Sequence, residues 1–224
     1  MKRREFIITS AAAGGILTSP VGSRLEPLPR RNRIRVAFML GDATNVIDTA
    51  GPWEVFQDTM VMQGGAHSGP FELITVGPSR RPLSMTAGLE LTPGFTFDDA
   101  PQANVLVVPA QRATETARAW LGRAAKQADM VMSICTGAFQ LARVGLLDGL
   151  AATTHHDSWD DFARQFPRIR LERGPRFVDN GRVATSGGLT SGIDLALHVV
   201  ARYFDVDTAR ATALYMEYQS ERWQ

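Results

Sequence analysis

Cys135 is the residue in this 224-residue chain best placed to act as a nucleophile. It follows the apolar run Met130–Ile134 and precedes a small, flexible Thr136-Gly137-Ala138 segment. Apolar residues then recur at helical spacing, which predicts a strand, a sharp turn and a helix with Cys135 in the turn. Unpaired N–H groups and the positive dipole end of a helix favour the thiolate, which is the nucleophilic form. The alternative is an inert buried cysteine that caps a core strand.

A carboxyl group is expected near this thiol. Pro52 suits the first turn of a helix, which would run to about Gln63 and end at Gly64-Gly65. Asp48 then lies just ahead of that helix, at the carboxyl end of a strand-loop unit. It could simply cap the helix. If its carboxyl group touches the thiol, the two groups share a proton, and a carboxylic acid there could protonate a substrate carbon.

Two adjacent histidines, His155 and His156, follow a short predicted strand. On an extended segment neighbouring side chains point in opposite directions, so at most one of them faces the site, and we choose His155. The alternative is that His155 bonds to the backbone. The run His155-His156-x-Ser158 offers no third metal ligand at good spacing, so we expect no metal site.

The elements that must position these groups are apolar strands that alternate with helices. This alternation predicts a parallel, doubly wound α/β sheet with helices on both faces. The predicted strands are Ile34–Leu40, Phe71–Val76, Val105–Pro109, Met130–Ile134 and a short one that runs into a loop within Ala151–His156, with a possible small hairpin at Leu83–Leu91. Ligands in such sheets bind beyond the carboxyl ends of strands. Asp48, Ala110, Cys135 and His155 all follow predicted strands and can converge at one edge.

Composition bounds the remaining possibilities. The chain is 44% hydrophobic and 21% charged, which fits one compact domain at residues 34–224. A net charge of +1 without a basic stripe in this domain gives no reason to expect a nucleic-acid partner. One cysteine excludes an intramolecular disulfide.

The first 23 residues are typical of a bacterial twin-arginine signal peptide. Arg3-Arg4 precede Glu5 and a short, weakly apolar stretch that is broken by Gly14-Gly15. The alternative is an amphipathic N-terminal helix. We expect cleavage near Ser23, export to the periplasm and no stable membrane anchor afterwards. Residues 24–33, rich in arginine and containing two prolines, are interpreted as an exposed linker.

Several stretches resemble the ThiJ/PfpI family of the class I glutamine-amidotransferase-like superfamily, nearest its isonitrile hydratase branch. The matching stretches are Asp48-x-x-Gly51-Pro52-x-Glu54-Val55-Phe56, Ser133-Ile134-Cys135-Thr136-Gly137-Ala138, Gly145-Leu146-Leu147-Asp148-Gly149, Ala152-Thr153-Thr154-His155 and Ser191-Gly192-Ile193-Asp194-Leu195-Ala196-Leu197. The resemblance implies a flavodoxin-like sandwich, a homodimer, no cofactor and a small-molecule substrate. It also implies Cys135 as nucleophile, Asp48 as the acidic residue over it and Thr136 as the residue that follows the cysteine in the hydratase branch. Gly51, Ala110, Gln111 and His155 are expected to contact substrate.

The sequence departs from the family pattern at three places. Many members have histidine directly after the cysteine, where this chain has Thr136. Most carry two glycines after the Val-Pro strand, where backbone N–H groups help to form an anion pocket, and this chain has Ala110-Gln111. Some relatives are regulators with a C-terminal helix-turn-helix domain, and because the sequence ends at Gln224 we expect none here.

These observations predict a cysteine-dependent hydratase or lyase that acts on a small electrophilic carbon compound. The candidate reaction converts an isonitrile to an N-substituted formamide. One alternative is a non-enzymatic ligand sensor or redox sensor whose cysteine oxidises reversibly. Another is a glyoxalase- or deglycase-like activity, which in this family usually goes with a glutamate and a histidine near the cysteine.

Overall fold

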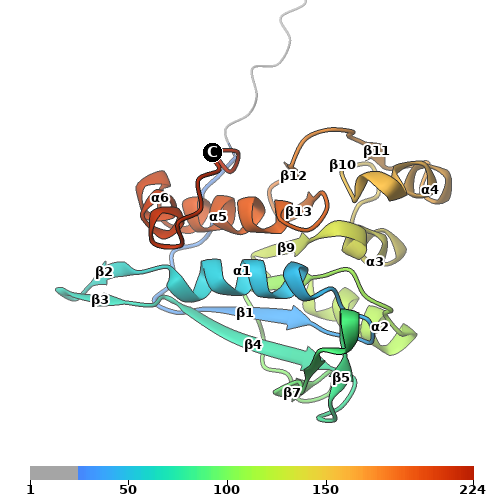
Figure 1. Ribbon diagram of the computed structural model, residues 1–224, viewed down its shortest axis with the longest axis horizontal. Helices are drawn as coiled ribbons and strands as arrows, with labels where there is room; N and C mark the ends of the chain where they lie inside the picture. Colours follow the sequence, from blue (N-terminus) through green and yellow to red (C-terminus); the bar gives the residue numbers. More distant parts are fainter. Residues whose placement is uncertain (1–24) are drawn as a thin grey trace, which may run out of the picture.

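The centre of the molecule is a seven-stranded sheet, and the computed structural model describes residues 25–224 (Figure 1). The strand order is β12-β13-β9-β8-β1-β4-β7, and every neighbouring pair is parallel except β12 with β13. The strands are β1 (Ile34–Met39), β4 (Phe71–Gly77), β7 (Phe95–Thr96), β8 (Val105–Val108), β9 (Met130–Ser133), β12 (Phe177–Asp179) and β13 (Val183–Ser186). The predicted doubly wound α/β fold is therefore confirmed.

Each face of this sheet carries its own apolar core, because side chains alternate along every strand. In β1, Val36 and Phe38 face one core, while Ala37 and Met39 face the other. The first core is covered by α1 (Val46–Asp58), α5 (Ser191–Tyr203) and α6 (Val206–Tyr215). The second is covered by α2 (Glu115–Ala124), α3 (Ala138–Arg143) and α4 (Trp159–Gln165). Burial on both faces explains why the central strands are continuous apolar runs.

Helix α1 begins earlier than the sequence predicted. Asn45 is its N-cap, and the Asn45 side chain accepts a hydrogen bond from the Ile47 N–H at 3.2 Å. Pro52 therefore lies inside the helix, and Asp48 lies in its first turn rather than ahead of it. The prediction treated the proline as the start signal, but an asparagine cap is an equally strong one. The shift keeps Asp48 at the sheet edge and fixes it on a rigid element.

Among the described residues, three short pairs of strands form outside the central sheet. They are β2 (Val61–Gln63) with β3 (Ala66–Ser68), β5 (Leu83–Ser84) with β6 (Glu90–Leu91), and β10 (Ala151–Ala152) with β11 (Arg170–Leu171). The β5–β6 pair confirms the hairpin expected at Leu83–Leu91. Gly64-Gly65 do not end a helix: both have positive φ, at 61° and 84°, and form the β2–β3 turn. Glycine adopts such angles without steric cost, which makes it equally suited to a hairpin turn and a helix end.

The described residues before β1 are held against the body of the protein. Leu28 is only 6% exposed and joins the first core, although its neighbours are exposed as predicted for a linker. The Leu28 N–H donates to the Arg202 carbonyl at 2.9 Å, and Arg31 forms a bidentate ion pair with Asp129. The predicted signal peptide lies outside the described residues. Among residues 25–224, no helix has the length and apolar character needed to cross a bilayer.

Candidate active site

Cys135 lies in a strained turn directly beyond β9, as the sequence predicted. It opens the short 3-10 helix Cys135–Gly137, which continues into α3. Its φ is +56°, a conformation that costs a residue with a Cβ and is common at functional sites. Its N–H donates to the Gly187 carbonyl at 2.9 Å, which ties the turn to the segment after β13. Gly137 permits the close approach, because a Cβ there would lie 2.0 Å from the Val108 carbonyl oxygen.

Three donors point at the Cys135 sulfur: the Thr136 N–H, the Leu189 N–H and the Thr136 hydroxyl. These donors favour a thiolate, but burial and the charge of Asp48 oppose it more strongly and raise the pKa of the thiol to about 11. The predicted lowering of the Cys135 pKa is therefore wrong. The cause is that the side chain is almost fully buried, with 7% of the residue exposed.

Asp48 supplies the carboxyl group expected beside the thiol. It has no exposed surface, and its Oδ2 accepts a hydrogen bond from the Ala110 N–H at 3.1 Å. Its Oδ1 has no hydrogen-bond partner among residues 25–224. Burial raises the pKa of this carboxyl to about 7, and the Ala110 hydrogen bond opposes the rise. The charge of Asp48 acts directly on the Cys135 thiol, so the two groups form an electrostatic pair.

The two pKa values define the protonation states of the pair near neutral pH. With the Cys135 pKa near 11 and the Asp48 pKa near 7, the thiol keeps its proton while the carboxyl is about half ionised. An ionised Asp48 next to a protonated thiol is a base next to a latent nucleophile. After it accepts the thiol proton, the same carboxyl becomes an acid that can release that proton to a bound molecule.

The loop Ala110-Gln111 is built differently from an open anion pocket. The Ala110 N–H is already bonded to Asp48, and the Gln111 side-chain amide donates to the Met39 carbonyl at 2.7 Å. Both donors therefore already have protein acceptors in this structure, and the expected contact of Ala110 and Gln111 with substrate stays a prediction. Gly51 permits close packing of α1 against α5, since a Cβ there would lie 2.9 Å from the Ile193 side chain.

A cavity of about 410 Å³ adjoins the site. Its wall includes Thr154, His155, Gly188 and Leu189, so the Leu189 loop that bonds the Cys135 sulfur also lines the cavity. The His155 ring packs against Gly188, where a Cβ would lie 2.2 Å from its Cδ2. The structure thus places His155 on the cavity wall next to the site, while its Nδ1 accepts the Asp157 N–H at 3.2 Å.

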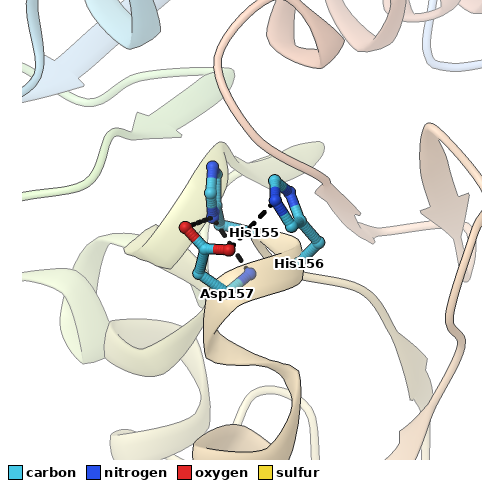
Figure 2. A group of neighbouring side chains, drawn as sticks. All are labelled: His155, His156 and Asp157. Carbon is cyan, nitrogen blue, oxygen red and sulfur yellow. Dashed lines mark hydrogen bonds and ion pairs between the residues drawn. The ribbon is translucent and has the colours of Figure 1, made fainter.

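The two histidines do not point in opposite directions, so that prediction is wrong. Their rings are stacked with centroids 4.4 Å apart, because the chain turns into the 3-10 helix His156–Ser158 directly after His155. Figure 2 shows both imidazoles beside the Asp157 carboxylate. The distances are 3.8 Å from His155 Nδ1 to Asp157 Oδ2 and 3.0 Å from His156 Nε2 to Asp157 Oδ1. Asp157 is therefore the third polar group that the sequence reading did not identify.

Two residues of the site were missed. Leu189 bonds the Cys135 sulfur through its backbone and has φ of +53°. The Thr154 hydroxyl donates to the Cys135 carbonyl at 2.9 Å, and the Thr154 carbonyl accepts from the Trp159 indole N–H at 3.1 Å. The glycines of Ser186-Gly187-Gly188 signalled a tight loop in this region, but no side-chain chemistry at Leu189 could have pointed to a backbone donor.

Comparisons with known proteins agree with this fold. The sequence pattern of the DJ-1/PfpI family matches residues 34–202. An isonitrile hydratase from Pseudomonas putida is 31% identical over 191 residues, which cover 83% of this chain and 78% of that protein. The transcriptional regulator GbdR from Pseudomonas aeruginosa is 28% identical over 181 residues, covering 79% of this chain but only 48% of the regulator. A solved ThiJ/PfpI family protein from Pseudomonas syringae superposes with a TM-score of 0.74 at 27% identity, covering 87% of this chain and 78% of that one.

Proposed function

We propose that this chain, which belongs to the DJ-1/PfpI family, is a cysteine-dependent hydratase that converts a small isonitrile to an N-substituted formamide. The observation that carries the proposal is the buried pair formed by the Asp48 carboxyl and the Cys135 thiol. The likeness to the Pseudomonas putida isonitrile hydratase supports the choice of substrate class.

The first step adds the thiol across the terminal carbon of the isonitrile. Ionised Asp48 takes the proton from Cys135, and the sulfur forms a bond to the terminal carbon, which gains electron density as it is attacked. Asp48 then returns the same proton to that carbon and gives a thioimidate, R–N=CH–S–Cys135. The Thr136 hydroxyl and the two backbone N–H groups at the sulfur stabilise the thiolate while it exists.

The second step releases the product and restores the enzyme. Water adds to the thioimidate carbon, and one of its protons goes to the nitrogen. The other proton passes through Asp48 to the sulfur as the carbon–sulfur bond breaks, so the thiol is regenerated as the product leaves. The sum is one isonitrile and one water consumed for one formamide formed, with no external oxidant or reductant. Asp48 serves as base for the water and as the carrier of the proton in transit.

The arrangement of donors favours this reaction over hydrolysis of an ester or amide. Acyl transfer develops a negative charge on oxygen and needs free donors aimed at it. Here the Ala110 N–H is bonded to Asp48, and the Cys135 N–H is bonded to Gly187. Attack on an isonitrile places the developing charge on carbon, where a proton donor is required, and Asp48 supplies one.

Turnover of alkyl isonitriles to formamides tests the proposal. Wild-type protein should form product well above an enzyme-free blank, and Cys135→Ala should form none above it. Asp48→Asn should lower kcat by about 10²–10⁴-fold, the usual range for loss of a general acid–base group. The rate should rise as the pH increases through about 7, because Asp48 must be ionised to accept the thiol proton. Equal turnover by wild type and Cys135→Ala would refute the proposal.

Redox sensing is the weaker candidate, because the thiol is buried. Oxidation to sulfenic acid requires an accessible thiolate. The Cys135 thiol is nearly buried and has a raised pKa, so mild peroxide should leave it reduced in the folded protein. Mass spectrometry of peroxide-treated folded and denatured protein would distinguish the two functions.

A further inference from the structure

We propose that His155, His156 and Asp157 form a binding site for a divalent transition-metal cation of the zinc class at the mouth of the cavity. One ring nitrogen of each histidine and a carboxylate oxygen of Asp157 all lie within 4.8 Å of one another. Figure 2 shows the three side chains gathered around a common point. The inference is independent of the hydratase reaction, because neither His156 nor Asp157 takes part in it.

The backbone on either side of the cluster is fixed by the surrounding fold. The Thr154 carbonyl is fixed by the Trp159 indole, and the first turn of α4 follows directly after the cluster. His156 lies between the stacked His155 ring and Trp159, whose ring centroid is 6.3 Å away at 73°. The two imidazole rings lie on the same side of the chain, although they belong to adjacent residues. The arrangement places both rings where one ion could reach them.

The distances suit coordination after a small adjustment. Zinc bonds imidazole nitrogen and carboxylate oxygen at about 2.0–2.2 Å, so two ligands in a tetrahedral site lie about 3.4 Å apart. The observed separations of 3.0 Å and 3.8 Å between Asp157 oxygens and the two rings lie on either side of this value. His156 and Asp157 are exposed, with side chains 68% and 76% accessible, so their rotamers are free to move.

The ligand chemistry selects the metal. Two imidazoles and one carboxylate suit zinc, nickel or copper, whereas magnesium and calcium prefer oxygen ligands alone. His155 Nδ1 accepts the Asp157 N–H, so this nitrogen carries no proton and can bind a metal once that contact is released. Three protein ligands leave one position of a tetrahedral ion for water or a ligand, and His155 and His156 both line the cavity.

Isothermal titration of the metal-stripped full-length protein with Zn²⁺ tests the site. We expect one Zn²⁺ per chain in the wild type and in Cys135→Ala. His156→Ala and Asp157→Asn should each weaken binding by at least about tenfold, because loss of even a supporting partner of a ligand costs about 10–100-fold. His67→Ala removes an exposed histidine from β3 and serves as the matched control, with unchanged affinity expected. Mg²⁺ should give no binding heat.

A spectroscopic probe separates this site from the cysteine. Co²⁺ bound at the cluster should give visible bands of nitrogen and oxygen ligation without the ultraviolet charge-transfer band of a thiolate. Circular dichroism of each variant establishes that it is folded before titration. The proposal is refuted if the wild type binds no Zn²⁺, if His156→Ala and Asp157→Asn bind as tightly as His67→Ala, or if Cys135→Ala abolishes binding.

Discussion

Asp48→Asn should make the protein more stable at alkaline pH while it removes the proposed proton carrier. The folded protein raises the pKa of the Asp48 carboxyl from 3.8 to about 7, so between these values the folded state binds more protons than the unfolded chain. The free energy of unfolding of the wild type therefore falls as the pH rises through this window. The decrease levels off above about pH 7, once the folded carboxyl is also ionised. Asparagine cannot ionise, and its side-chain oxygen can still accept the Ala110 N–H, so the variant escapes this loss.

The magnitude follows from the pKa displacement. At 1.36 kcal/mol for each pH unit, the ionisation of buried Asp48 lowers the free energy of unfolding by at most about 4 kcal/mol at pH 8. About 2.5 kcal/mol of this arises between pH 5 and pH 8, because the unfolded carboxyl is already ionised at pH 5 while the folded one is not. The stability advantage of Asp48→Asn over the wild type should therefore grow by about 2.5 kcal/mol across that range.

Urea unfolding at pH 5, 6, 7 and 8 measures this difference. Asp98→Asn removes one carboxylate from an exposed position and controls for the change in net charge. The difference between Asp98→Asn and the wild type should stay nearly constant with pH. If Asp48→Asn differs from the wild type by the same free energy of unfolding at pH 5 and pH 8, burial does not raise the pKa of the Asp48 carboxyl. That result would refute the reasoning.

Three further predictions concern the turn, the N-terminal segment and export. Gly137→Ala should prevent folding, because its Cβ would lie 2.0 Å from a main-chain carbonyl oxygen of β8. Gly122→Ala on α2 is the control: its Cβ meets no atom within 4 Å, and it should stabilise the protein by up to about 1 kcal/mol. Circular dichroism and thermal melts compare the two variants. Leu28→Ala should lower the free energy of unfolding, measured with urea, by about 2–5 kcal/mol. A decrease below about 0.5 kcal/mol would show that the segment does not contribute to the core. Replacing both Arg3 and Arg4 by lysine should leave full-length, folded protein in the cytoplasm on cell fractionation, because lysine lacks the planar fork of arginine; unchanged export would exclude a twin-arginine signal.

The sequence predicted the sheet well because its strands are buried on both faces. Ile34–Leu40 and Val105–Pro109 are continuous apolar runs, which are typical of strands in a parallel sheet that is covered by helices on both faces. The start of α1 was missed because two start signals, Asn45 and Pro52, compete within one stretch. Gly64-Gly65 was misread because glycine with positive φ ends helices and turns hairpins alike.

The candidate site was predicted in its position but not in its electrostatics. Strand ends brought Asp48 and Cys135 to one edge, and the structure places them there. The direction of the Cys135 pKa depends on how deeply the thiol is buried, which no local pattern encodes. Leu189 contributes a backbone N–H from more than 50 residues away along the chain. The orientation of His156 depended on a helical turn where the sequence suggested an extended segment.

Burial gives the Asp48–Cys135 pair a property that neither residue would have in water. A thiolate at rest in an accessible turn would be open to oxidation, whereas a protonated thiol with a raised pKa is protected until a substrate arrives. Burial also holds Asp48 near its midpoint at neutral pH, where a group passes a proton in either direction at least cost. The small, uncharged isonitrile that we propose as substrate would enter such a site without a charge of its own to desolvate. The same desolvation that lowers the stability of the fold at alkaline pH thus keeps a proton on the pair, as the proposed transfer to carbon requires.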